Sequence, residues 1–563
     1  MNSADGAELL FLPLGGTGEI GMNLNLYGLG RWDGRHEDVD WLMVDFGITF
    51  ADGWPPGTDV ILPDPAFIEK RRDRLLGLVL THAHEDHLGA VPYLWQRLGC
   101  PIYATPFTRA FLARKLADNG IVNEVPVHEV PLGGRFDIGP FDLELITLTH
   151  SIPEPNAVAI RTSAGTVLHT GDWKLDPDPV VGEASDEAAL SALGDEGVLA
   201  IVCDSTNALA EGHSGSEAAL KENLTDLIGA CEGRVAVGCF ATNVARLQTI
   251  SEAARANGRD VALVGRSLWR VQAAARETGY LADVPAFVPA EDAGAIPDDK
   301  LVLICTGSQG ESRAALSRIA QGDHPHVTLG AGDTVIFSSK IIPGNEVTIG
   351  RLHNDLVALG VKVIDENDAL VHVSGHPNRE ELVAMYQHVR PAISVPVHGE
   401  RRHLEAHAAL ARTCQVNKAL VIENGALVRL GPGEADDASV IDHVPSGRLA
   451  WDGNRAIPID GEMIRVRTRA LFHGSAVVTI ALDGKRGLAG EPQVTTAGVL
   501  EDDETEGVIG RIRDAVWRTI DGLGAKALGD DAAVREAVRI AVRRSFRDQL
   551  DKRPVTTVHL VRI

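Results

Sequence analysis

The chain has 563 residues, 44% of them hydrophobic, and a formal net charge of −25 at pH 7. This length allows two to four domains with ample core, and no apolar run is long enough to cross a membrane, so we expect a soluble protein with no membrane partner. The acidic balance argues against a nucleic-acid substrate, because phosphate binding draws on Lys and Arg. Residues 463–563 nevertheless carry 17 Lys and Arg against 14 Asp and Glu. Net charge therefore weighs against a nucleic-acid partner without excluding one.

The cysteines and the N-terminal segment indicate a reducing compartment. The segment Met1–Leu10 lacks a basic stretch followed by a small-residue cleavage site, and the six cysteines form no close pairs. Both features are typical of a cytoplasmic protein.

A glycine-rich stretch, Gly15–Gly21, joins two runs that we expect to be strands, Glu8–Leu14 and Met22–Tyr27. It contains a literal Gly-x-Gly-x-x-Gly, and Asp45 lies about where a ribose-binding acid of a dinucleotide fold would stand. That interpretation fails, because a helix should begin at these glycines, whereas residues 23–27 alternate like a strand. The sequence predicts a turn between paired strands instead.

A dense cluster of candidate metal ligands follows the apolar run Leu75–Leu80, which reads as a buried strand. His82 and His84 are two residues apart and would point to one side of an extended backbone, while Asp86 and His87 turn towards a second position. Imidazole with carboxylate suits zinc or manganese better than calcium or magnesium. The spacing predicts two metal ions; isolated core or surface histidines are the weaker alternative.

One earlier and two later strand ends carry residues that could complete such a site. Asp45 could orient a ligand histidine, although a turn or capping aspartate explains it equally well from spacing alone. The run Phe141–Thr149 leads to His150, and Thr166–Thr170 leads to Asp172. Together with the histidine cluster, these residues resemble the metallo-β-lactamase superfamily, whose two metals are held by such a motif, a later His and a bridging Asp. The resemblance implies an α/β fold, an αββα sandwich of two mixed sheets faced by helices, with the site at the strand ends.

After Asp204 the sequence alternates strand and helix again, which predicts an inserted α/β domain with an open parallel sheet. The expected strands are Arg234–Cys239, Val261–Val264, Leu301–Cys305 and Thr334–Phe337, and the expected helix is Asn243–Asn257.

Three residues outside the first cluster make the resemblance more specific. Asp204, His376 and His398 match the three additional motifs of the β-CASP nucleic-acid-processing nucleases. Within that group, four runs resemble the ribonuclease J family of bacteria: Leu14–Asn23, Phe240–Gln248, Cys305–Glu311 and Ser338–Glu346. The resemblance covers nearly the whole chain.

Carried over residue by residue, the resemblance implies two metal sites that share a bridging Asp172. One would be held by His82, His84, His150 and Asp172, and the other by Asp86, His87, Asp172 and His398. Zinc is the expected metal, with manganese as the alternative. His376 resembles the histidine that faces the scissile phosphate, and Asp204 the acid that orients it. We expect His372, His403 and His407 to be structural or surface residues.

Two short stretches offer hydroxyls, small residues and backbone donors of the kind that cradle phosphate. They are Ser374, Gly375 and His376, and Thr306, Gly307 and Ser308. Because the family accommodates a terminal monophosphate, we expect a preference for 5′-monophosphorylated RNA.

The C-terminal region predicts a small α/β domain. Ser475–Leu482 and Val555–Ile563 read as strands, and two helices carry apolar residues four apart. In the family this domain supports oligomerisation, so a homodimer or homotetramer is expected. The predicted boundaries are 1–207 and 369–451 for the two parts of the metallo-β-lactamase domain, 208–368 for the β-CASP domain, 452–462 for a linker and 463–563 for the C-terminal domain.

The resulting hypothesis is a cytoplasmic, metal-dependent ribonuclease with 5′-to-3′ exonuclease and endonuclease activity in RNA processing and decay. Two metals would share an activated hydroxide and clamp the phosphate. Two alternatives stay open: a thioester or lactone hydrolase of the same fold, and an inactive scaffold in an RNA-decay assembly.

Overall fold

The computed structural model describes residues 6–34, 38–51, 53–342, 344–483, 487–501 and 504–563. Residues 1–5 of the segment Met1–Leu10 and residue 343 of the run Ser338–Glu346 lie outside the described residues. The chain forms two compact units, one of Met1–Asp52 with Val60–Arg448 and one of Gly53–Asp59 with Leu449–Ile563. Among the described helices, none is both long enough and apolar enough to span a bilayer.

The first sheet of the larger unit has eight strands in the order β25-β24-β1-β3-β4-β7-β8-β9. Pairing is antiparallel from β25 to β4 and parallel from β4 to β9. The strands are β25 (Ser439–His443), β24 (Ala426–Gly431), β1 (Glu8–Gly15), β3 (Leu24–Gly30), β4 (Val39–Val44), β7 (Leu75–Val79), β8 (Ile102–Ala104) and β9 (Val127–Glu129).

The second sheet has seven strands in the order β10-β11-β12-β13-β14-β21-β23 and is also mixed. Its parallel part, β13-β14-β21-β23, brings together strands from distant parts of the chain. The strands are β10 (Arg135–Ile138), β11 (Phe141–Thr147), β12 (Asn156–Thr162), β13 (Gly165–His169), β14 (Ala200–Asp204), β21 (Ile393–Val397) and β23 (Lys418–Ala419).

The two sheets share one core, in which Phe11 and Val44 of the first sheet are buried with Val202 of the second. Helices α5 (Glu187–Glu196), α11 (Arg379–Val389) and α12 (Arg401–Thr413) cover the other face of the second sheet, where Leu190 and Leu382 are buried with Ile201. Apolar burial of this kind contributes about 25 cal/mol per Å². The predicted α/β class, two mixed sheets with helices on them, is confirmed.

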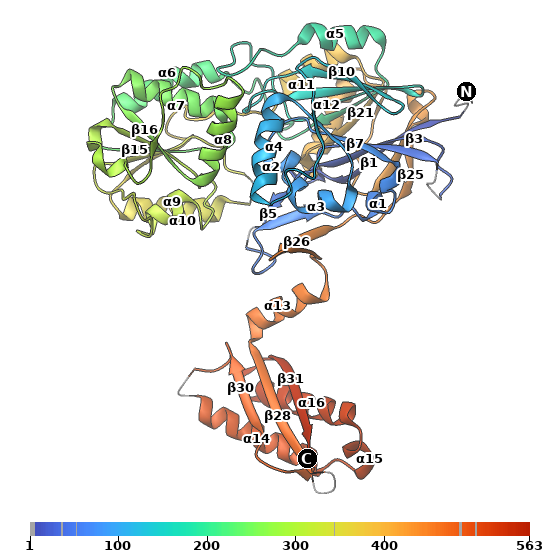
Figure 1. The fold of residues 1–563 in the computed structure, drawn as a ribbon, viewed down its shortest axis with the longest axis vertical. Coiled ribbons are helices and arrows are strands. Elements are labelled where there is room, and N and C mark those ends of the chain that lie inside the picture. Colours follow the sequence, from blue (N-terminus) through green and yellow to red (C-terminus); the bar gives the residue numbers. More distant parts are fainter. Residues whose placement is uncertain (1–5, 35–37, 52, 343, 484–486, 502–503) are drawn as a thin grey trace. The chain divides into compact units, whose positions relative to one another are not determined.

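A six-stranded, wholly parallel sheet forms between β14 and β21 in the chain, in the order β17-β16-β18-β15-β19-β20. Such sheets are covered on both faces, which is why these strands read as continuous apolar runs. Figure 1 shows the sheet with α6, α7 and α8 on one side and α9 and α10 on the other. The four strands and the helix expected here are confirmed: β15 (Val235–Gly238), β16 (Asp260–Val264), β18 (Leu301–Cys305), β19 (Thr334–Phe337) and α7 (Val244–Ala256). The structure adds elements that the sequence analysis did not name: β17 (Val288–Pro289), β20 (Lys362–Ile364), α6 (Glu217–Gly229), α8 (Arg266–Glu277), α9 (Ala315–Ala320) and α10 (Glu346–Ala358).

The glycine-rich stretch is a turn, as predicted, because β1 and β3 pair antiparallel on either side of it. Gly16 and Gly21 have φ angles of 86° and 90°, a conformation that side chains rarely adopt. Within the turn, β2 (Thr17–Gly18) pairs with β22 (Gly399–Glu400). The turn therefore contacts the backbone next to His398, whose N–H donates to the carbonyl of Gly16 at 2.6 Å.

The smaller unit holds β26 (Arg448–Asp452) paired with β27 (Arg455–Pro458), α13 (Glu462–His473) and a small sheet. Part of the expected linker is thus strand β27. In the sheet, β31 (Val555–Arg562) pairs parallel with the central β28 (Ser475–Asp483), and β30 (Gln493–Ala497) pairs antiparallel. Helices α14 (Thr505–Asp521) and α16 (Asp531–Leu550) bury the apolar positions predicted from their spacing. The domain boundaries themselves stay a prediction.

Candidate metal centre

The candidate residues lie where neighbouring strands end. β13, β14 and β21 are adjacent and parallel, so the segments that follow them meet at one edge of the second sheet. Asp172 follows β13, Asp204 ends β14 and His398 follows β21. In the first sheet, β7 runs parallel to β4 and leads into the histidine cluster, whose last residues form α2 (Glu85–Leu88). Strand order therefore explains why residues more than 300 positions apart share a site.

The first group of possible ligands is His82, His84, His150 and Asp172, whose ligand atoms all lie within 4.8 Å of one another. Nδ1 of His84 is 3.0 Å from Nε2 of His82 and 3.1 Å from Nε2 of His150. These separations are near the roughly 3.3 Å edge of a tetrahedron with zinc–nitrogen bonds of about 2.0 Å. The geometry of this group therefore fits a metal ion.

Burial keeps these three imidazoles neutral. It lowers the pKa of His82 and of His150 well below the usual value and that of His84 to about 4. Nδ1 of His150 contacts the carbonyl oxygen of Gly375, which leaves Nε2 directed at the group. Neutral nitrogens with free lone pairs are the form in which histidine binds metals.

The second group is Asp86, His87, Asp172 and His398, again within 4.8 Å. Nε2 of His87 is 3.2 Å from a carboxylate oxygen of Asp172, and Nε2 of His398 is 3.1 Å from one of Asp86. Nδ1 of His87 lies 2.7 Å from Asp45, whose carboxylate also accepts the N–H of Thr81 at 2.8 Å. Asp45 thus contacts a candidate ligand histidine, as an orienting acid would, and its role stays a prediction.

Asp172 belongs to both groups and shows the clearest fit to a bound cation. It is 3% exposed, and its Oδ1 makes no hydrogen bond within the described part of the chain. Burial opposes its ionisation, yet the histidines His398, His87 and His376 hold its pKa well below the usual range. Nδ1 of His398 lies 3.7 Å from Oδ1, beyond hydrogen-bond distance. A buried carboxylate oxygen without a hydrogen bond is costly unless a cation binds it.

Asp204 and His376 form a separate pair at the edge of the site. Nδ1 of His376 donates to Asp204 at 2.8 Å, and the other oxygen of Asp204 accepts the N–H and hydroxyl of Thr206. Burial alone would lower the pKa of His376, but Asp204 and Asp172 raise it above the usual value. A third group that could hold a metal consists of Asp172, Asp204, His376 and His398. Geometry by itself therefore fits two roles for Asp204 and His376, as metal ligands or as groups that act on the phosphate.

The two stretches expected to bind phosphate lie in different places. Ser374, Gly375 and His376 are beside the metal groups, and a side chain at Gly375 would lie 2.6 Å from the ring of His150. Thr306, Gly307 and Ser308 follow β18 in the parallel sheet, and no hydrogen bond among the described residues joins them directly to Ser374–His376. A longer connection exists. Gln309 donates to the carbonyl of Lys340, and Lys340 donates to Asn207.

Sequence reasoning missed several polar side chains that support the site. Asn207 donates to the hydroxyl of Ser374 and the carbonyl of His376, and the Thr206 hydroxyl lies 2.8 Å from Nδ1 of His398. Both lie within three residues after Asp204, so the polar run after β14 was an available signal. Lys340 carried no such signal. His403 and His407 make hydrogen bonds elsewhere, to Glu400 and to Ser205 and Tyr386, and His372 lies beside Arg246.

Comparison with known families agrees with this geometry. The family described as "Metallo-beta-lactamase superfamily" matches residues 40–223, "Ribonuclease J, beta-CASP domain" matches 232–356, "Zn-dependent metallo-hydrolase RNA specificity domain" matches 360–420 and "Ribonuclease J C-terminal domain" matches 462–563. A crystal structure of a protein of unknown function from Enterococcus faecalis covers 75% of this chain and 100% of its own at 16% identity, with a TM-score of 0.51. That likeness concerns the fold alone.

Relatives named ribonuclease J match along almost the full chain. The protein of Sinorhizobium meliloti is 45% identical over 561 residues, covering 100% of this chain and 98% of the relative. The protein of Mycolicibacterium smegmatis is 39% identical, and the match covers 98% of this chain and 96% of the relative. The protein of Helicobacter pylori is 30% identical, and the match covers 99% of this chain and 80% of the relative. The resemblance seen in the sequence is confirmed: the chain belongs to the ribonuclease J family of metal-dependent ribonucleases.

Proposed function

We propose that this protein degrades RNA from the 5′ end and also cuts it internally, with two divalent ions at the strand-end site. The observation that carries the proposal is the pair of overlapping ligand groups that share the buried Asp172. His82, His84 and His150 would hold one ion, and Asp86, His87 and His398 the other, with Asp172 between them. When bound, two such ions activate a water molecule and neutralise charge on the phosphate.

Zinc is the proposed metal. The first group offers three neutral imidazoles and one carboxylate, a ligand set typical of four-coordinate zinc. The second offers two carboxylates and two imidazoles, which manganese would also accept. Metal analysis of the protein purified without added metal, followed by reconstitution with each ion, decides between them.

Asp204 and His376 are proposed to act on the phosphate. Because His376 donates Nδ1–H to Asp204, its Nε2 is left to face the substrate, and no hydrogen bond to Nε2 occurs within the described residues. The side chain of His376 is 22% exposed, whereas that of Asp204 is fully buried. His376 would thus stabilise the scissile phosphate or protonate the leaving oxygen, with Asp204 holding the ring in place.

A preference for 5′-monophosphorylated RNA is proposed for the same site. The hydroxyl of Ser374 and the backbone around Gly375 lie within the loop that carries His376, and Asn207 holds this loop by two hydrogen bonds. Such small groups can surround one phosphate but leave little room for three. The second stretch expected to bind phosphate, Thr306–Ser308, contributes to this pocket at most through the hydrogen bonds that link Gln309, Lys340 and Asn207.

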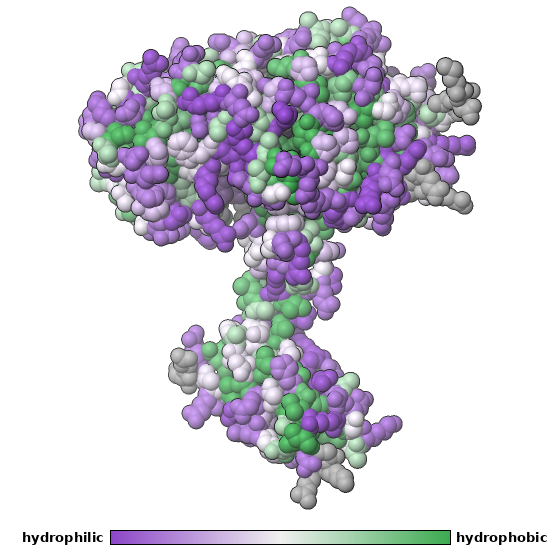
Figure 2. Space-filling view, in the orientation of Figure 1, coloured by the Kyte–Doolittle hydropathy of each residue, from purple (hydrophilic) through white to green (hydrophobic). Residues whose placement is uncertain are grey.

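Self-association is proposed for the smaller unit. Helix α13 exposes Met463, Val466, Leu471 and Phe472, the last two at 68% and 65%, and Figure 2 shows hydrophobic surface over this helix. An apolar strip of this kind is typical of an interface. This strip supports a homodimer or homotetramer, and it could also serve within an RNA-decay assembly. The six cysteines form no disulfide, which supports a location in the cytoplasm.

The decisive experiment compares the purified protein on matched RNA, DNA and thioester substrates, with and without a chelator. Chelator-sensitive cleavage of RNA is the expected result. Turnover of the thioester alone would indicate a small-molecule hydrolase, and no turnover of any substrate with full metal content would indicate an inactive scaffold.

A further inference from the structure

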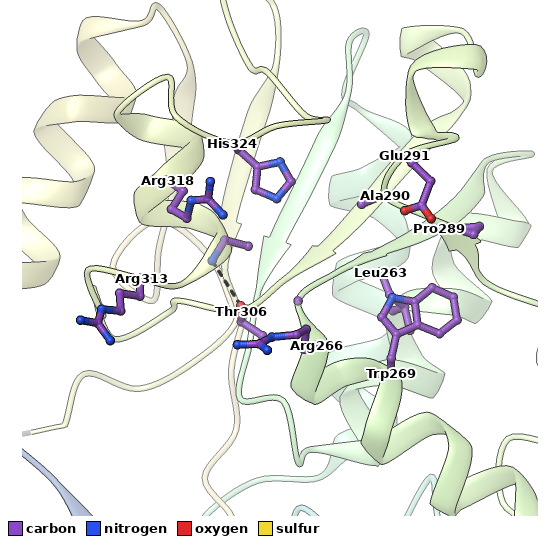
Figure 3. A pocket seen from close by; sticks show the side chains of 12 residues that line it. Leu263, Arg266, Trp269, Pro289, Ala290, Glu291, Thr306, Arg313, Arg318 and His324 are labelled. Atoms are coloured by element: carbon purple, nitrogen blue, oxygen red, sulfur yellow. Dashed lines mark hydrogen bonds between the residues drawn. The ribbon is translucent and has the colours of Figure 1, made fainter. Parts of the chain in front are cut away.

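A cavity of about 680 Å³ lies in the parallel sheet, at the carboxyl ends of β16 and β18. Leu263 and Gly265 line it from β16, and Thr306 lines it from the end of β18 (Figure 3). In open α/β sheets, ligands bind outside the carboxyl ends of the strands, and a volume of this size suits a small molecule. None of the metal-group residues lines the cavity, so it is distinct from the centre described above.

The cavity is rich in positive charge. Three arginines, Arg266, Arg313 and Arg318, line it, against a single acid, Glu291. His324 also lines it and adds no charge near pH 7, because burial and the nearby Arg318 lower its pKa. Arg266 is exposed and makes no hydrogen bond or ion pair with the described residues. Arg318 donates to the carbonyl of Asp323 at 2.7 Å, and its Nε lies 3.7 Å from the carboxylate of the same residue, in an ion pair that is open to solvent. Guanidinium groups bind phosphate through paired hydrogen bonds, so this wall favours an anionic phosphate ligand.

The start of α8 adds further donors to this wall. Its first residue is Arg266, and no side chain in the described part of the chain caps the N-terminus of this twelve-residue helix. Gly265 has a φ of 143°, and a side chain there would lie 2.5 Å from Thr306. The glycine thus lets the helix begin against Thr306, with its unsatisfied N–H groups beside the arginines. A helix N-terminus in this setting stabilises bound phosphate.

The opposite wall suits a nucleoside. In Figure 3, Arg313 and Arg318 lie on one side of Thr306, and Trp269 and Glu291 lie on the other. The indole of Trp269 is half-buried, and indole faces stack on nucleobases of any sequence. Glu291 makes no ion pair with the described residues, so its carboxylate can accept hydrogen bonds from ribose hydroxyls or a base amino group.

We propose that this cavity binds one nucleoside phosphate, with the phosphate at Arg266 and Arg318 and the base against Trp269. The unit could belong to an RNA strand or be a free nucleotide, because both present the same chemistry. In the first case the proposal rests on the function proposed above, and in the second it is independent of it.

The test uses the full chain and two photoreactive probes, 4-thiouridine 5′-monophosphate and a short single-stranded RNA that contains 4-thiouridine. We expect crosslinks on the peptide that contains Trp269. Crosslinks from both probes identify an RNA-binding site, and crosslinks from the mononucleotide alone identify a free-nucleotide site. Crosslinks confined to peptides of the metal centre overturn the proposal.

Calorimetric titration with uridine 5′-monophosphate gives the matched measurement. Arg266→Ala should weaken binding at least tenfold, which corresponds to about 1.4 kcal/mol. Arg351→Ala is the control, because Arg351 is an exposed arginine of α10 outside the cavity and its loss should leave the affinity unchanged. Equal affinities in the two variants overturn the proposal.

Competition settles the ligand class. The nucleoside assignment is overturned if inorganic phosphate displaces the nucleotide at equal concentration. It is also overturned if a polyglutamate peptide binds in preference to the nucleotide. None of these readouts involves turnover. A protein that fails to cleave RNA would therefore count against the proposed function and not against the cavity.

Discussion

The pairing of Asp204 with His376 predicts that the two side chains act as one unit in cleavage. Nδ1 of His376 donates to a fully buried Asp204 at 2.8 Å, so removing Asp204 frees the ring to turn and removes the charge that favours its protonation. A positioned acid or base contributes about 10²- to 10⁴-fold to a rate. Asp204→Ala and His376→Ala should each lower the single-turnover rate constant by about this factor, which equals about 2.7–5.4 kcal/mol.

The double variant distinguishes a unit from two independent groups. If Asp204 acts only through His376, the double variant should be within about tenfold of the slower single variant, because residues that act together are non-additive. If the two side chains contributed independently, the rate constant of the double variant should instead fall by about 10⁴- to 10⁸-fold. The measurement is single-turnover cleavage of a 5′-monophosphorylated RNA, with metal content determined on the same samples.

A matched pair on the surface provides the control. His213 and Glu380 form an ion pair at 2.8 Å with side chains that are 67% and 62% exposed, so their alanine variants should leave the rate unchanged. Thermal unfolding checks that each variant is folded. Full additivity of the two losses at the site would falsify the pairing, and loss of metal in His376→Ala would show that His376 is a ligand.

Further predictions concern the metals, the loop and the smaller unit. His84→Ala should abolish chelator-sensitive cleavage and lower metal content by mass spectrometry, and wild-type turnover in the folded variant would contradict the two-metal assignment. Gly375→Ala should displace His150 and destabilise the protein by about 1–3 kcal/mol, whereas Gly350→Ala, with open space around it, should not; equal melting temperatures would contradict this. RNA with a 5′-monophosphate should be degraded faster than the same RNA with a 5′-triphosphate, and equal rates would remove the phosphate pocket. Ending the chain at Gly461 should reduce the oligomer in light scattering and weaken activity on long RNA more than on a dinucleotide, at unchanged metal content.

Much of the architecture is readable from the sequence because its signals are local. Continuous apolar runs such as Leu301–Cys305 predict buried parallel strands, and the spacing of His82, His84, Asp86 and His87 predicts a metal centre. The resemblance then indicates which distant residues join it. Each of these signals needs only a few neighbouring residues.

The supporting contacts are not readable in this way, because they join segments that the chain brings together only on folding. Lys340 reaches Asn207 over 133 positions and Asn207 reaches Ser374 over 167. Neither lysine nor asparagine has a spacing that marks such a role. The glycine-rich turn is a similar case, since its resemblance to a phosphate-binding loop gives no hint that its backbone holds His398.

The backbone conformation of two site residues was equally hidden. Asp45 and His398 have φ angles of 64° and 52°, in the left-handed region that costs a non-glycine residue about 1–2 kcal/mol. Each is the first residue after a strand, and each is held by a backbone hydrogen bond, from Asp45 to Val79 at 2.9 Å and from His398 to Gly16 at 2.6 Å. A strand that simply continued would alternate its side chains between the two faces of the sheet. The left-handed turn instead directs Asp45 towards His87 and His398 towards Asp86. Surrounding hydrogen bonds thus maintain a local strain that brings one candidate ligand, and the acid beside another, to the same site. Strand order thus determines which residues can come together at the site, while the backbone conformation of Asp45 and His398 determines the direction of their side chains.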